Sequence, residues 1–218
     1  TDPERPRHKG VSILILDTQA QGFSTTVIPT TSNPTAATYY DNVRVPKDML
    51  VGELNGGWKL ITAQLNHERL GLGAWSDKVF APFVKVLQWA KAKDEQGRRA
   101  VDQAWVRRSL AECYARLEAM RLTNFRIAAS LEAGAMDVSL ASATKVYGSE
   151  GVVEVLHQLM DIVGSSALVR GGSAASYLMG ELEYELRAST INTFGGGTNE
   201  IQRELIAQFG LGMPRPQR

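Results

Sequence analysis

Little in this sequence points to disulfides, metal sites or membranes. The single cysteine, Cys113, cannot form an intramolecular disulfide and gives no metal-ligand spacing, so a reducing compartment fits best. The longest apolar run, around residues 13–16, is far shorter than the roughly 20 residues of a membrane-spanning helix. The first ten residues contain no apolar signal core either. We therefore expect a cytoplasmic protein that has neither a metal centre nor a membrane anchor.

An excess of charge of either sign is also missing, because 24 lysine and arginine residues face 23 aspartate and glutamate residues. This balance gives no electrostatic indication that nucleic acid or an anionic membrane is the partner. Short basic clusters at residues 5–9 and 98–108 are interpreted as solvated surface. The chain does have 218 residues, of which 44% are hydrophobic, and this is enough to bury a core.

The chain lacks an initiator methionine, and a predicted strand follows shortly after its start, which is typical of a sequence cut at a loop. β-Branched and aromatic residues then alternate with turn formers in "VSILILD", "GFSTTVIPT" and "ATYYDNVRVP". This pattern predicts three strands between residues 11 and 45. Three such strands can scarcely close a core, so we expect their edges to pair with something outside the chain.

After residue 57 the apolar residues recur at intervals of three and four, which predicts helices. The first helix runs from Trp58 to about Ala90, and Gly71, Gly73 and Pro82 should loosen or bend it. Short connections between the helices favour antiparallel neighbours in a bundle. The later apolar stripes are Val106 to Leu131, then Val152, Leu156, Leu159 and Val163, then Leu178, Leu182 and Leu186, and finally Ile201, Leu205 and Phe209.

The stretch "INTFGGGTNEIQREL", residues 191–205, places three consecutive glycines before the last predicted helix. Glycine inside ordered structure costs roughly 0.5–1 kcal/mol relative to alanine, so a run of three indicates a sharp bend or a close approach. Asn199 and Gln202 have the spacing of a capping box. By itself the motif favours an ordinary turn over a site where free helix amides attract an anion, and it does not decide between them.

Three longer stretches, "YYDNVRVPKDMLVGELNGGW", "LNHERLGLG" and "GGGTNEIQRELIAQFGLGMPR", resemble acyl-CoA dehydrogenases in their order and approximate separation. The resemblance covers essentially the whole chain and implies a mainly α fold. Residues 1–55 would be the C-terminal part of the central β-domain, which is a partial β-barrel segment, and residues 56–218 the C-terminal four-helix bundle. The family's N-terminal helical domain and early barrel strands have no counterpart here. A fragment is therefore implied, and we expect it to bind FAD weakly or not at all and to be inactive alone.

The resemblance also implies an activity in fatty acid and lipid metabolism. Family members use FAD to desaturate an acyl-CoA thioester between its α and β carbons, and they pass the electrons to an electron-transfer flavoprotein. Positions that contact FAD in the family match Thr198, Glu200, Gly196, Gly197 and Gly164 of this sequence. Positions near the substrate match Asn66, Arg69 and Gly195.

The expected reaction needs a carboxylate, because a proton α to a thioester carbonyl is only weakly acidic. Many family members carry this glutamate directly before the Gly-Thr of the motif, where this sequence has Gly196. A minority pattern places the glutamate on the first long helix of the bundle, at the position of Glu68. This paired change implies that Glu68 is the catalytic base, whereas composition alone favours a surface carboxylate.

Two family features are missing from this chain. The stretch "SDKVFAPFVKVLQWA" has Lys78 and no match for an arginine that reaches the FAD of a neighbouring subunit. The stretch "MDIVGSSALVRGG" keeps Gly164 but has lost a glutamine and a second glycine. These losses fit a half-site subunit of a hetero-oligomer, and they also fit a divergent homo-oligomer. An acyl-CoA oxidase or flavin monooxygenase on the same scaffold, and a non-catalytic subunit, stay open as alternatives.

Overall fold

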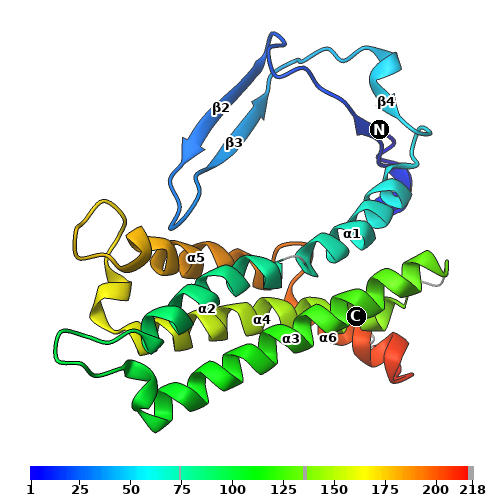
Figure 1. The fold of residues 1–218 in the computed structure, drawn as a ribbon. Helices are drawn as coiled ribbons and strands as arrows, with labels where there is room; N and C mark the ends of the chain where they lie inside the picture. The colour runs from blue at the N-terminus through cyan, green and yellow to red at the C-terminus, as the bar shows by residue number, and fades with distance from the viewer. Residues whose placement is uncertain (74, 135–136, 216–218) are drawn as a thin grey trace. The chain divides into compact units, whose positions relative to one another are not determined.

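The computed structural model describes residues 1–73, 75–134 and 137–215, without the side chains of residues 7, 66, 67, 69–73, 75–77 and 179. The chain forms two compact units, Thr1–His67 and Glu68–Arg218, and the first is drawn in blue and cyan in Figure 1. Their border falls within helix α1 (Gly57–Gly73), whereas the sequence places its domain boundary just before this helix. Among the described residues, none of the helices has the length and apolar character that crossing a membrane requires.

Two antiparallel strand pairs make up the β structure of the first unit (Figure 1). Strand β1 (Ile13–Leu14) pairs with β4 (Leu50–Val51), and β2 (Phe23–Ile28) forms a hairpin with β3 (Thr35–Tyr40). The three predicted strands are therefore present, although β1 has only two residues and its partner β4 was not predicted.

The β2–β3 hairpin leaves most of its side chains exposed on both faces. Val27 is 65% exposed and Tyr40 is 62% exposed, even though large apolar side chains are usually buried in a sheet. This exposure agrees with the expectation that these strands cannot close a core among themselves.

Helix α1 begins where the chain passes close to the strand at its N-terminal end. The Gly57 amide donates a hydrogen bond to the Val11 carbonyl at 3.0 Å. A Cβ atom on Gly57 would lie 3.0 Å from the Ser12 backbone, so only glycine fits without displacement. The contact fixes the start of the helix that later carries Glu68.

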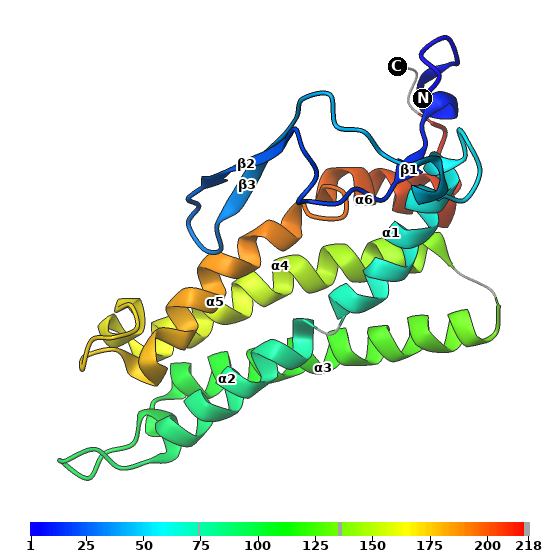
Figure 2. The same cartoon turned by 90° about the horizontal axis from the view of Figure 1, so that it is seen from above.

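Helices make up the second unit, as predicted. They are α2 (Trp75–Lys91), α3 (Ala104–Glu132), α4 (Val138–Val163), α5 (Glu181–Ser189) and α6 (Asn199–Leu205). Figures 1 and 2 show α2, α3 and α4 side by side, and α3 and α4 run in opposite directions. Helix α4 contacts each of α2, α3, α5 and α6, so it is the central helix of the bundle.

The apolar stripes predicted for α3 and α4 form the core of this bundle. Leu117 on α3 packs into the same buried cluster as Leu156 and Leu159 on α4, and all three are 0% exposed. The N-terminus of α4 is capped by the Asp137 carboxylate, which accepts hydrogen bonds from the amides of Ser139 and Leu140. Hydrogen bonding from the Leu140 amide, followed by that from Ser139, lowers the pKa of Asp137.

The helix predicted from Trp58 to about Ala90 is described as α1 and α2, and residue 74 between them lies outside the described residues. Two other helix predictions need correction. Leu178 lies in a 3-10 turn, η5 (Tyr177–Gly180), because α5 begins only after Gly180 with its φ of +82°. In the last stripe, Ile201 is 40% and Phe209 is 65% exposed, so these side chains do not belong to the core of this chain.

Two glycines of α4 give a matched pair of stability predictions. Gly151 lies where α3 and α4 approach, and a Cβ atom there would collide with Met120 Cε, whereas a Cβ on Gly148 meets nothing within 4 Å. We expect Gly151→Leu to lower the free energy of unfolding by about 1–3 kcal/mol through overpacking. Gly148→Ala should raise it by about 0.5–1 kcal/mol, because alanine favours the helix. Urea unfolding measures both, and equal effects would contradict the close α3–α4 packing.

Candidate functional site

The predicted site centres on the glycine loop, residues 194–198, which connects the 3-10 turn η6 (Thr190–Thr193) to α6. Gly196 and Gly197 have φ angles of +69° and +102°, in the region that favours glycine. A Cβ atom on Gly197 would lie 2.7 Å from Gln202 Nε2, which is too close for a side chain. The run of glycines is therefore required by the bend itself and by its close approach to Gln202.

Gly195, the first glycine of the loop, is also held close to the preceding turn. Its amide donates a hydrogen bond to the Ile191 carbonyl at 2.7 Å, and a Cβ atom there would lie 3.1 Å from the same oxygen. All three glycines thus lie in a loop whose backbone path is constrained by its neighbours.

Thr198 is the N-cap of α6, and this corrects the predicted capping box. The Thr198 Oγ1 accepts a hydrogen bond from the Ile201 amide at 3.3 Å. Asn199 is instead the first helical residue and is only 3% exposed, while Gln202 is 1% exposed. Both side chains are buried, and Asn199 bonds to Lys145, Ser149 and Glu150 on α4 in place of capping its own helix.

The carboxylate of Glu200 lies exposed at the same helix start. Hydrogen bonds from its own backbone amide and from the Thr198 hydroxyl lower the pKa of Glu200, and the charges of Arg203 and Lys145 act in the same direction. Glu200 is therefore an ionised acceptor at neutral pH, beside a hydroxyl that orients it.

Behind the glycine loop lies a buried polar group that the sequence analysis missed. We call it the lysine cluster. Lys145, Ser149 and Asn199 are its buried members, and Glu150 and Arg203 extend it to the surface, where both side chains are exposed. Lys145 Nζ donates hydrogen bonds to Asn199 Oδ1 at 2.6 Å and to the Thr193 carbonyl at 3.0 Å. Asn199 Nδ2 donates to Glu150 Oε1 at 2.9 Å, and Arg203 pairs with the same carboxylate at 2.8 Å. The cluster therefore connects the centre of α4 to both ends of the loop.

A sequence signal for this cluster does exist. Lys145 falls at intervals of four between Ala141 and Ser149, and the stripe continues to Val152 and Leu156, both of which are buried. A lysine on the apolar stripe of a central helix is an indication of a buried, hydrogen-bonded ammonium.

Three buried polar atoms in this region have no hydrogen-bond partner in the part of the chain that the structure describes. They are Ser142 Oγ, Asn192 Nδ2 and Gln202 Oε1. Buried groups of this kind are commonly satisfied by internal water.

The residues around the glycine loop fit a flat, partly apolar ligand. Ile191 is 53% and Phe194 is 58% exposed, so apolar side chains lie at the surface before and within the loop. The loop adds backbone without side chains, and Thr198 and Glu200 add an exposed hydroxyl and an exposed carboxylate. This combination suits the ring system and hydroxyl-bearing chain of a flavin.

The predicted base, Glu68, lies on α1 with its side chain exposed to solvent. The side chains of Asn66 and Arg69, which the resemblance places near the substrate, lie outside the described residues.

Gly164 follows the C-terminal end of α4, whereas Lys145 lies nearer its N-terminal end. Gly164 caps the helix with φ +80°, and its amide donates to the Met160 carbonyl at 2.8 Å. Since a helix rises 1.5 Å per residue, Lys145 and Gly164 are separated by about 28 Å along α4. One copy of this chain thus does not bring Gly164 together with the glycine loop.

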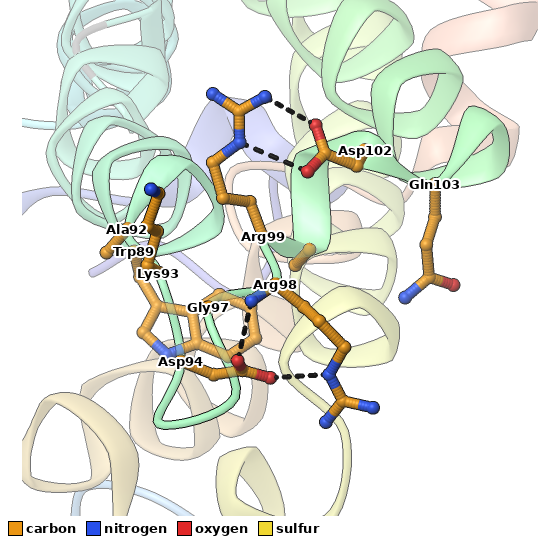
Figure 3. Close-up of a pocket in the computed structure, with 10 residues that line it drawn as sticks. Trp89, Ala92, Lys93, Asp94, Gly97, Arg98, Arg99, Asp102 and Gln103 are labelled. Atoms are coloured by element: carbon orange, nitrogen blue, oxygen red, sulfur yellow. Dashed lines mark hydrogen bonds and ion pairs between the residues drawn. The ribbon is translucent and has the colours of Figure 1, made fainter.

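A separate hollow of about 820 Å³ lies at the connection between α2 and α3 (Figure 3). Its arginines are paired locally: Arg98 Nε lies 3.0 Å from Asp94 Oδ2, and Arg99 Nη2 lies 2.7 Å from Asp102 Oδ1. Hydrogen bonding from the Arg98 backbone amide is the largest of the effects that lower the pKa of Asp94. The ion pairs order the connection, in agreement with the interpretation of this basic cluster as solvated surface.

With the geometry in view, the comparisons with known proteins decide the family. Residues 55–211 match the family model described as "Acyl-CoA dehydrogenase, C-terminal domain". The chain belongs to the acyl-CoA dehydrogenase family. The resemblance and the mainly α fold predicted from the sequence are thereby confirmed, and the chain is part of an oxidoreductase family.

Individual acyl-CoA dehydrogenases match over the whole chain. Acyl-CoA dehydrogenase FadE26 of Mycobacterium tuberculosis (strain ATCC 25618 / H37Rv) is 43% identical over 227 residues, which cover 100% of this chain and 56% of the relative. Acyl-CoA dehydrogenase FadE29 of the same strain is 39% identical over 222 residues, with the same two coverages of 100% and 56%. The chain thus spans about half the length of the curated relatives that it matches.

Two solved structures share the fold closely. The Tcur3481-Tcur3483 steroid ACAD aligns with a TM-score of 0.93 and 46% identity, and the match covers 99% of this chain and 55% of that chain. The ChsE4-ChsE5 complex from Mycobacterium tuberculosis aligns with a TM-score of 0.90 and 43% identity, over 99% of this chain and 56% of that chain. Both structures carry two component names, and the second is described as a complex.

Proposed function

We propose that this chain belongs to an FAD-dependent acyl-CoA dehydrogenase that desaturates an acyl-CoA thioester between its α and β carbons. One observation carries the proposal. Gly196, at the position where many family members carry the base, has no side chain and a φ of +69° that disfavours one, while an accessible carboxylate is available at Glu68. The base is thus assigned to α1.

In this assignment the residues of the chain have separate tasks. Glu68 accepts the α proton of the thioester, and Asn66 and Arg69 help to hold the substrate beside it. Gly195, Gly196 and Gly197 keep side chains away from the reacting end of the thioester. Bound FAD supplies the hydride acceptor, and its electrons pass to an electron-transfer flavoprotein.

The cofactor contacts follow from the same loop. The Thr198 hydroxyl and the Glu200 carboxylate are exposed at the start of α6 and would hold FAD by hydrogen bonds. Gly164 would contact FAD from another copy or subunit, because it lies about 28 Å along α4 from Lys145. The site would therefore be completed only in an oligomer.

We further assign a hetero-oligomer and a steroid-derived acyl-CoA to this protein. The match to the ChsE4-ChsE5 complex supports the hetero-oligomer, and the match to the Tcur3481-Tcur3483 steroid ACAD supports the steroid-derived substrate. The missing arginine in the stretch that contains Lys78, and the lost glutamine and glycine near Gly164, support the hetero-oligomer, because a partner subunit would then supply the missing FAD contacts.

Anaerobic mixing of the complete protein with acyl-CoA thioesters tests this function. The protein, with any subunit that co-purifies, should be yellow, and its flavin colour should bleach on addition of a steroid-derived acyl-CoA more rapidly than on addition of a fatty acyl-CoA. Absence of bleaching with every acyl-CoA would contradict the dehydrogenase. Rapid hydrogen peroxide release when oxygen is admitted would instead favour the acyl-CoA oxidase.

A further inference from the structure

Lys145 is an unusual residue to find in the centre of a helical bundle. Its side chain is 2% exposed, and it lies on α4 among the buried residues that face α6. Moving an ammonium from water into a protein interior is costly unless hydrogen bonds compensate it. A structural helix position would be filled at lower cost by an apolar side chain, so the contacts that Lys145 makes indicate its purpose.

Those contacts lie at the two ends of the glycine loop. Lys145 Nζ donates to the carbonyl oxygen of Thr193, the residue before the loop, at 3.0 Å. It donates to Oδ1 of Asn199, the residue after the loop, at 2.6 Å. One buried cation thus holds both ends of a loop that has little conformational restraint of its own, because three of its five residues are glycine.

The rest of the lysine cluster fixes the orientation of Asn199. Asn199 Nδ2 donates to Ser149 Oγ at 3.1 Å and to Glu150 Oε1 at 2.9 Å. The amide oxygen accepts from Lys145 and, at 3.3 Å, from Ser149 Oγ, while the amide nitrogen is directed toward Glu150. Arg203 donates to both carboxylate oxygens of Glu150, at 2.9 and 2.8 Å, and holds that carboxylate in place.

We propose that Lys145 is a positioning residue that holds the glycine loop in its binding conformation by bracing Thr193 and Asn199 at its two ends. The identity of the bound groups, a flavin and a thioester, rests on the proposed function. Lys145 itself touches neither, and it acts through the backbone of residues 194–198. Removal of the ammonium therefore loosens the loop and weakens binding, while the bundle core remains packed.

The first test measures the loop directly in the complete protein, by hydrogen exchange with mass spectrometry. Lys145→Met keeps much of the apolar stem and removes the ammonium. We expect exchange of peptides that cover residues 194–199 to rise about tenfold to a hundredfold, the factor for losing a hydrogen bond to a charged group. The exchange rate of peptides from α3 should not change. Unchanged loop exchange, or an even rise through α3 and α4, would overturn the proposal.

Lys85→Met is the matched control, because it removes a lysine from the same bundle. Lys85 lies on α2, and its ammonium pairs at the surface with Glu181 at 2.6 Å. Its loss should leave exchange of the glycine loop unchanged. A rise equal to that of Lys145→Met would show that loop exchange responds to any lost charge, and would overturn the bracing role.

Asn199→Leu provides a second route if Lys145→Met fails to fold, because it removes the acceptor at one end of the loop. Loop exchange should rise in this variant too. The double variant Lys145→Met, Asn199→Leu should show a smaller rise in loop exchange than the product of the two single-variant rises. The reason is that both changes break the same contact. Independent, fully multiplied effects would contradict a brace that acts through Asn199.

Kinetics then distinguish a positioning residue from a general core residue. Lys145→Met should raise KM for the acyl-CoA and the dissociation constant of FAD by about tenfold or more, and lower kcat by a smaller factor. A pure loss of active protein, with KM and flavin affinity unchanged, would overturn the proposal. If the wild-type protein turns over no acyl-CoA, the proposed function fails, and the exchange experiment still decides the role of Lys145.

Discussion

Turnover of an acyl-CoA by the complete protein is expected to fall by about a hundredfold to ten-thousandfold when Glu68 is replaced by glutamine. Glutamine has nearly the shape of glutamate but cannot accept the α proton at neutral pH. Gly196 offers no substitute, because it has no side chain. Steady-state rates under saturating substrate measure the effect, and the absorption spectrum of the bound flavin checks that the cofactor is retained.

Glu112→Gln is the matched control for this experiment. Glu112 lies on α3 and is also exposed, and its replacement by glutamine removes the same negative charge. Its replacement should leave turnover within about twofold of the wild-type rate, since surface substitutions away from special features have small effects. Full turnover in Glu68→Gln would remove Glu68 as the base, and an equal loss in both variants would point to a general effect of charge.

Gly197→Ala is expected to damage both stability and flavin binding. The φ of +102° strains an alanine, and its Cβ would lie 2.7 Å from Gln202 Nε2, whose side chain is buried at 1% exposure. Backbone strain of this kind lowers the free energy of unfolding by about 1–3 kcal/mol. The loop must also shift away from Gln202, so the affinity for FAD should fall about tenfold or more. Urea unfolding and flavin titration measure the two effects.

Gly97→Ala separates strain from contact. Gly97 has a φ of +77° but lies in the α2–α3 connection, where a Cβ atom would meet nothing within 4 Å. Gly97→Ala should lower the free energy of unfolding through backbone strain alone and leave the affinity for FAD unchanged. If Gly97→Ala and Gly197→Ala had the same effects on both measurements, the close approach of Gln202 to the loop would be contradicted.

Periodic burial made the bundle predictable from the sequence. Leu117 on α3 and Leu156 and Leu159 on α4 recur at helical spacing, and they are fully buried where the two helices pack. The glycines of residues 195–197 also predicted a bend or a close approach correctly, because few other reasons justify three consecutive glycines before a helix. Both features depend on residues close together in the sequence, so they could be predicted from it.

Other features depend on partners distant in the chain. The sequence predicted Asn199 as a helix cap. Its side chain instead hydrogen-bonds to Lys145 and Glu150, about fifty residues earlier, and Thr198 caps the helix. Lys145 itself was missed because a charged residue usually indicates surface. The apolar pattern of Ile201 and Phe209 predicted core, yet these side chains are exposed, and their apolar character fits contact with a ligand or another subunit.

The proposed chemistry requires Glu68 to lie across the substrate from the glycine loop, and a crystal structure of the complete assembly with a bound acyl-CoA analogue measures this directly. The predicted result is a Glu68 carboxylate oxygen at about 3–3.5 Å from the α carbon, the separation of reacting atoms in a productive complex. A Glu68 side chain that points into bulk solvent, away from residues 195–197, would contradict its assignment as the base.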